Sequence, residues 1–221
     1  MAQFAVLYEK FCRTIVIIFT VHVAIVVHAL MGAVVVGFFP AIAAAHNTYR
    51  VWLLNDDRLW RVRETWLVFH REWKASMRSA QAIGWLQFGI SLLLAYDYFI
   101  VNWNVRTGML GVVLSGFFVV LLAVMILWSA MCWAVQSHFS ERTTWIMRYA
   151  FSMVIARPLC SVLLGCAIFM IAWCYVQWPG LIIGFGTSTF AFATEIIVYC
   201  FGKLPGLDPR EHEDLAPVTL G

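Results

Sequence analysis

The chain has 221 residues, of which 62% are hydrophobic and only 12% are charged, and its formal net charge is +3. An average soluble domain carries about 25% charged residues, and a domain of this size cannot bury so much apolar surface in one core. The composition therefore excludes an ordinary soluble domain and indicates a membrane protein, for which the bilayer is a second solvent.

Long apolar segments recur along the chain. A helix rises about 1.5 Å per residue, so about 20 residues cross the ~30 Å hydrocarbon core of a bilayer. The segments lack the alternation of a membrane barrel, and open strands leave backbone groups unpaired in lipid. We therefore predict an all-α membrane protein in which one domain, residues 1–203, is a bundle of about five transmembrane helices. The predicted spans are residues 14–39, 80–100, 109–135, 156–176 and 180–201.

The first predicted span ends near Pro40 and contains two histidines, His22 and His28. Its apolar run is far longer than the core of a cleaved signal peptide, and a basic segment follows it, so we expect a retained helix. Six residues correspond to about 600° of helical rotation, so the two histidines lie about 120° apart. Because polar groups inside a span are costly, His28 is a candidate intramembrane polar site.

Residues 57–78 are predicted to form an amphipathic helix outside the bilayer, after the first span. Apolar side chains recur there every three or four residues, which places them on one face. Two interpretations fit this face: an interfacial helix with tryptophans at the lipid headgroups, or a docking surface for another protein. The residues of this candidate membrane- or partner-binding face are Leu59, Val62, Trp66, Phe69, Trp73 and Met77.

The basic residues divide unevenly between the two sides of the predicted topology. Twelve of the 15 lysines and arginines lie in residues 40–79, between the third and fourth spans, or in the tail. Positive charge is retained in the cytoplasm, so we predict an external N-terminus and a cytoplasmic C-terminus. Lys10 and Arg13 lie on the opposite side, which a short interfacial helix over residues 3–13 or a first helix that does not fully cross would explain. Residues 204–221 are predicted to be a flexible cytoplasmic tail.

Two charged residues lie at the inner ends of the last two predicted spans. Glu195 lies about six residues, or ~9 Å, from the end of its span, and Arg157 begins the fourth span with Pro158. Because an unpaired charge is costly there, we expect Glu195 to pair with Arg157 and to hold two helices together. A protonated Glu195, a proton-relay or substrate role, and a contact with a partner protein are the alternatives.

The sequence contains no catalytic constellation. Gly184 and Gly186 are not followed by the third glycine of a dinucleotide-binding turn, and no Gly-x-Ser-x-Gly or His-Glu-x-x-His motif occurs. No cysteine spacing is typical of a metal site. We therefore predict no enzymatic activity, no metal, no cofactor and no nucleic-acid partner.

Short motifs in a particular order carry a family resemblance. They are Gly32-Ala33, Phe39-Pro40-Ala41, Trp66, Phe69, Trp73-Lys74, Ile83-Gly84-Trp85, Met147-Arg148-Tyr149-Ala150, Arg157-Pro158, Phe185-Gly186-Thr187-Ser188 and Phe192-Ala193. In this order and spacing the chain resembles the YesL family of small bacterial membrane proteins over most of residues 10–203. The resemblance implies a compact set of helices with a Trp/Phe-rich segment after the first.

Members of that family are commonly encoded beside ATP-driven carbohydrate importers, and no enzymatic activity is established for the family. The resemblance therefore implies an accessory membrane subunit or assembly factor of a bacterial carbohydrate ABC importer, in contact with permease subunits and membrane lipids. A permease itself is disfavoured, because Glu72-Trp73-Lys74-Ala75 does not match the helix that grips the ATPase. Two alternatives stay open: a homodimeric small-solute transporter, and a b-type haem redox protein with two histidines at matching depth.

Overall fold

The computed structural model describes residues 2–55, 60–104 and 108–202, and within them the regular secondary structure is entirely α-helical, as predicted. Leu59 and the predicted tail, residues 204–221, lie outside the described residues. The helices are α1 (Ala2–Met31), α2 (Phe38–Leu54), α3 (Val62–Ala75), α4 (Met77–Asn104), α5 (Met109–His138), α6 (Thr143–Ala156), α7 (Pro158–Gln177) and α8 (Gly180–Phe201).

In the part of the chain that the structure describes, five apolar helices are long enough to cross a bilayer. They fit a multi-pass membrane protein whose apolar helices contact lipid, and Pro158 occupies the first turn of α7 as predicted. The candidate spans are Leu7–Met31, Met77–Trp103, Met109–His138, Pro158–Gln177 and Gly180–Phe201.

The first predicted span, residues 14–39, is not one continuous helix. α1 ends at Met31, and a tight turn over residues 32–37 leads into α2. The two ends of the turn nearly touch, because a Cβ atom added at Gly32 would lie 2.3 Å from the Cα atom of Gly37. Between them, Ala33 and Val34 adopt left-handed backbone angles, with φ of 53° and 63°. Because consecutive valines make this turn apolar, hydropathy alone does not reveal that the helix ends here.

α2 is a central helix that the sequence does not predict. It packs against α1, α3, α4, α5 and α8, and it contributes to two apolar cores. Its alanines, among them Ala41, Ala44 and Ala45, are buried, and their small side chains let neighbouring helices approach closely. Residues 38–54, most of which we predicted to lie outside the bilayer as part of a cytoplasmic segment, are therefore part of the helical core.

α3 runs beside α1 and does not lie alone on a membrane surface. Trp60, Arg61 and Val62 share a surface pocket with Glu9 and Arg13 near the start of α1. The predicted topology places these two groups of residues on opposite sides of the membrane, which this proximity contradicts. The predicted amphipathic helix, residues 57–78, is also shorter than expected, because Met77 already begins α4.

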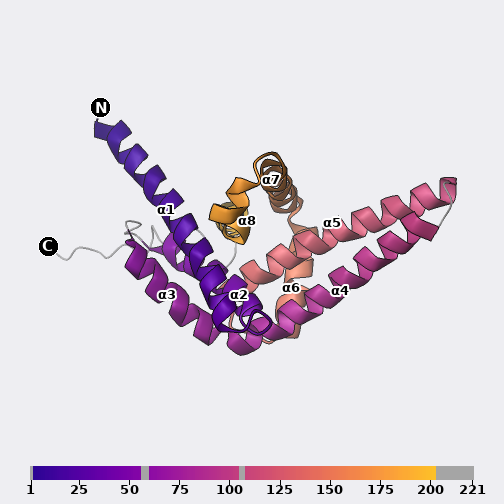
Figure 1. The fold of residues 1–221 in the computed structure, drawn as a ribbon, viewed down its shortest axis with the longest axis horizontal. Coiled ribbons are helices and arrows are strands. Elements are labelled where there is room, and N and C mark those ends of the chain that lie inside the picture. Colours follow the sequence, from indigo (N-terminus) through magenta and orange to yellow (C-terminus); the bar gives the residue numbers. More distant parts are fainter. Residues whose placement is uncertain (1, 56–59, 105–107, 203–221) are drawn as a thin grey trace.

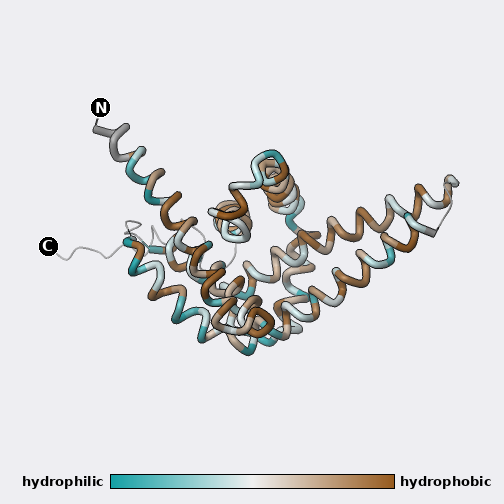
Figure 2. Tube along the Cα trace, viewed as in Figure 1, coloured by the Kyte–Doolittle hydropathy of each residue, from teal (hydrophilic) through white to brown (hydrophobic). Residues whose placement is uncertain are grey.

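The helices diverge more than a parallel bundle would. Figure 1 shows α1 and the α4–α5 pair extending to opposite sides from the region around α2, with α7 and α8 between them in this view. Figure 2 shows hydrophobic residues along most of α1, α4 and α5. α8 bends at Gly186, where φ is 29° and ψ is −128°, and the His22 ring fills the space beside this glycine. The candidate site described next lies where α2, α5 and α8 meet.

Candidate functional site: a buried carboxylate beside an apolar pocket

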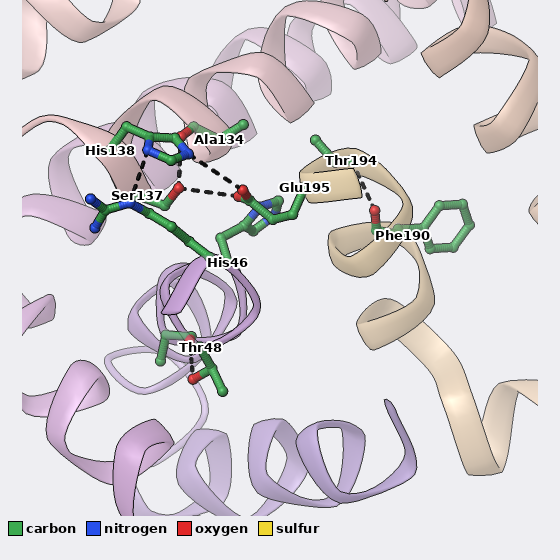
Figure 3. Close-up of polar contacts among 10 residues, drawn as sticks. His46, Thr48, Ala134, Ser137, His138, Phe190, Thr194 and Glu195 are labelled. Atoms are coloured by element: carbon green, nitrogen blue, oxygen red, sulfur yellow. Dashed lines mark hydrogen bonds and ion pairs between the residues drawn. The ribbon is translucent and has the colours of Figure 1, made fainter. Parts of the chain in front are cut away.

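Glu195 on α8 is only 1% exposed, and its carboxylate is surrounded by polar groups from two other helices (Figure 3). Oε1 lies 2.8 Å from Nδ1 of His46 on α2 and accepts a hydrogen bond of 3.2 Å from the Ser137 hydroxyl on α5. Oε2 lies 3.8 Å from Nε2 of His138, which ends α5. A buried charge needs such partners, so these contacts bind the three helices together.

Helical spacing brings the partners to one place. His46 lies on the buried face of α2, and Arg50 follows it by four residues, so the two side chains lie on one side of the helix. Ser137 and His138 lie in the last turn of α5. On α8, Ala191, Glu195 and Val198 are all buried and share one face at spacings of four and three residues.

Arg50 determines which nitrogen of His138 carries the proton. The guanidinium Nε donates to Nδ1 of His138 at 2.9 Å, so Nδ1 accepts and the proton of the neutral ring is on Nε2. That N–H faces Oε2 of Glu195. The distance of 3.8 Å is too long for a hydrogen bond, so Nε2 of His138 has no hydrogen-bond partner among the described residues.

The predicted pair between Glu195 and Arg157 is wrong. Among the described residues, no ion pair joins them, and the carboxylate of Glu195 contacts His46, Ser137 and His138 instead. Arg157 lies between the end of α6 and the start of α7. The expected pairing failed because the nearer partner comes from α2, a helix that was not predicted.

Ser137 is not placed as a nucleophile. Its hydroxyl lies 2.7 Å from the carbonyl of Ala134 and 3.2 Å from Glu195, and no histidine nitrogen in the described part of the chain bonds it. A nucleophilic serine needs a base at hydrogen-bond distance. The arrangement can hold a negative charge or a proton between imidazoles, but Ser137 lacks the contact that would activate it.

A pocket of about 430 Å³ lies beside this network, between α1, α2, α4, α5, α7 and α8. His46 forms part of its wall, together with aromatic residues such as Trp133 and Phe190 and the hydroxyl-bearing residues Ser91, Ser129, Thr187 and Thr194. Pockets for small ligands are commonly 300–1,000 Å³, mostly apolar, with a few polar groups. His46 thus connects the buried carboxylate to a space of the size that small ligands need.

The predicted partner-binding face of α3 is covered mainly by the chain itself. Phe69 is fully buried and Trp73 nearly so, both within the core formed with α1, α2 and α8. Trp66 and Met77 are partly buried against the same core, whereas Val62 is 54% exposed. This face is therefore an intramolecular contact, and Phe69 and Trp73 do not present a surface for lipid or a partner.

His28 lies at the centre of that contact. Its Nδ1 donates to the carbonyl of Ala24 at 2.8 Å, so Nε2 of the neutral ring accepts from Nδ1 of His70 at 2.9 Å. The rings of Trp66, Phe69 and Trp73 surround it, with centroids 5.0–5.3 Å away. His28 thus joins α1 to α3, a structural role that needs no ligand. The sequence could have indicated that His70 belongs to this contact, because His70 follows Trp66 by four residues on the same helix.

One part of the chain matches a known protein family. Residues 18–98 match the family model described as "Protein of unknown function, DUF624". The match covers the C-terminal part of α1, all of α2 and α3, and most of α4, so it includes His28, His46 and Arg50 but not Ser137, His138 or Glu195. No curated protein and no solved structure matches the chain.

Proposed function

We propose that the chain is a non-catalytic accessory subunit or assembly factor of a carbohydrate ABC importer in the bacterial cytoplasmic membrane, with an external N-terminus and a cytoplasmic C-terminus. The resemblance to the YesL family supports this role, and we infer that the matched family of unknown function is the same family. The matched residues 18–98 coincide with the first half of the segment that carries the resemblance. The site supports a role without catalysis, because Ser137 faces a carboxylate and a carbonyl.

The α4–α5 hairpin is the observation that best supports a partner. With 28 and 30 residues the helices are about 42 and 45 Å long, more than the ~30 Å needed to cross the hydrocarbon core. Its outer part is joined internally by a 3.2 Å hydrogen bond from Ser115 to Asn102. It presents an exposed apolar surface that a permease helix can pack against, formed by Leu92, Leu93, Phe99, Phe117 and Val120. The docking surface is thus assigned to this hairpin in place of α3.

Site-specific photocrosslinking in cells tests this assignment. A photoreactive residue at Phe117, on the exposed surface of α5, should crosslink to permease subunits encoded nearby. The same residue at Val162, equally exposed on α7, is the matched control and should give no such product. Absence of permease products from Phe117, with normal insertion of the chain, would contradict the accessory role.

A homodimeric transporter of small solutes is the second candidate, because a pocket adjoins a buried carboxylate. Transport would require the purified chain to carry solute across liposome membranes with no other protein present. Flux that is lost in Glu195→Gln, in a variant that still forms dimers, would favour this candidate over the accessory role.

A further inference from the structure

α6 joins two membrane spans on one side of the bilayer. With 14 residues it is about 21 Å long, too short to cross the ~30 Å hydrocarbon core. α5 before it and α7 after it are both long enough to cross, so the ends that α6 connects lie at the same membrane surface. α6 packs against α5, where the indole of Trp128 donates to the carbonyl of Met147 at 3.0 Å.

The composition of α5 changes at this contact. Residues 109–127 contain a single hydroxyl, amide or imidazole group, that of Ser115, whereas residues 129–138 contain four such groups. Polar side chains are costly in hydrocarbon, and tryptophans such as Trp128 are typical of the boundary between hydrocarbon and water. α6 therefore lies where α5 leaves the hydrocarbon.

α6 has a buried face and an exposed face. The residues of the buried face, which belong to the core formed with α5, are Ile146, Ala150 and Met153. Arg148, Phe151 and Ile155 are exposed, and spacings of three and four residues place them together on the other side of the helix. Trp145 is partly exposed as well and stacks on Tyr149, with ring centroids 4.9 Å apart. The exposed face thus combines large apolar side chains with a cation.

The charge of this segment is positive. Residues 139–157 hold Arg142, Arg148 and Arg157 against one acid, Glu141. Arg142 and Arg148 are exposed, and in the described part of the chain neither guanidinium makes an ion pair or a side-chain hydrogen bond. The planar set of N–H donors on a guanidinium matches the oxygens of a phosphate group. Two cations are thus available to anions at the membrane surface.

We propose that α6 is an interfacial helix whose exposed face binds anionic phospholipids, with Phe151 and Ile155 among the acyl chains and Arg142 and Arg148 at the lipid phosphates. A zwitterionic lipid brings its own ammonium group to the arginines, so an anionic headgroup is favoured. α7 begins two residues after α6 ends and has exposed apolar residues of its own, so lipid already lies beside this face. This binding goes beyond the accessory role and does not depend on it.

Photocrosslinking to lipid tests the proposal. The purified full chain carries a photoreactive residue at Ser152, which is exposed and follows Arg148 by four residues. It is reconstituted into nanodiscs that contain equal amounts of phosphatidylglycerol and phosphatidylcholine with the same acyl chains. Each arginine near the headgroups should favour the anionic lipid about fivefold, so mass spectrometry should find a product ratio of about five or more, which falls towards one in ~1 M salt. The same residue at Phe169, exposed in the middle of α7, should label both lipids equally.

Two double variants separate the arginines of α6 from net charge. Arg142→Gln with Arg148→Gln should bring the product ratio at Ser152 to about one but keep the total lipid labelling, because the apolar residues still enter the membrane. Arg63→Gln with Lys74→Gln removes the same charge from exposed positions on α3 and should leave the ratio unchanged. Absence of lipid products at Ser152, or an equal ratio with and without the two arginines of α6, would overturn the proposal.

Discussion

At the residue scale, the buried polar side chains around Glu195 form one connected network of contacts across three helices. Arg50 donates to His138, the free N–H of His138 faces Glu195, and Glu195 also accepts from His46 and Ser137. The chain of contacts begins on α2, passes through α5 and returns to α2 by way of α8. Removal of one member leaves its neighbour buried without a counterpart, which costs more than the pair contributes.

His46→Ala should therefore destabilise the protein strongly. We expect a loss of about 1–3 kcal/mol, because the buried carboxyl of Glu195 loses its closest hydrogen-bond partner. Adding Glu195→Gln should restore part of the stability, since a neutral amide requires less compensation. The measurement is unfolding of the purified protein in detergent, and a double variant no more stable than His46→Ala alone would contradict the interpretation.

Sequence alone could identify the carboxylate but not its partners. Glu195 stood out because an ionisable residue in an apolar span is costly. His46 and Arg50 were assigned to a cytoplasmic segment, because residues 40–54 include polar side chains and are not apolar enough to count as a span. The signal was their spacing of four residues directly after the alanine-rich run at Ala41–Ala45, which suits a buried helix with one polar edge.

At the scale of elements, α3 shows that an amphipathic pattern does not reveal what covers the apolar face of a helix. Its apolar face was predicted correctly from the spacing of Trp66, Phe69 and Trp73, but the sequence cannot tell whether lipid, a partner or the same chain covers such a face. In the structure the cover is α1 and α2, and Trp73 also donates to the carbonyl of Gly37 at 3.4 Å. The face therefore contributes to folding.

Trp73→Ala should accordingly reduce the amount of folded protein, not merely the recovery of a partner. Truncating a buried tryptophan typically costs about 3–5 kcal/mol. Val62→Ala, at an exposed position of the same helix, is the control and should have little effect. Fluorescence-detected size-exclusion chromatography measures the amount of folded protein for both variants. Normal accumulation of Trp73→Ala would show that this face is not part of the core.

The turn between α1 and α2 makes a second prediction at this scale. Val34 has a φ of 63°, which is unfavourable for a β-branched residue by roughly 1–2 kcal/mol. Val34→Gly should remove this strain and raise the melting temperature. Val36→Gly removes the same side chain from an equally exposed position of ordinary φ, so it should lower the melting temperature. Identical effects of the two changes would mean that the backbone at Val34 is not strained.

At the scale of the whole molecule, the break at residues 32–37 changes the predicted topology. One long first span would carry residues 40–79 to the inner side, together with most basic residues. In the structure, α2 returns along α1, so residues 60–62 lie beside Glu9 and Arg13. The five long apolar helices were predictable from length and hydropathy, whereas this reversal depends on two glycines and two left-handed residues within an apolar run.

Labelling from the two sides of the membrane tests this arrangement. Cysteine at Glu9 and at Arg61 should react with an impermeant thiol reagent from the same side, because both residues border one surface pocket. With an external N-terminus that side is the outside, and cysteine at Met109, the first residue of α5, should react there as well. The parent chain provides the background from its own cysteines, of which Cys166 and Cys200 are exposed on apolar helices. Reaction of Glu9→Cys from outside and of Arg61→Cys only in inside-out vesicles would restore the simple charge-based topology and contradict the return of α2 along α1.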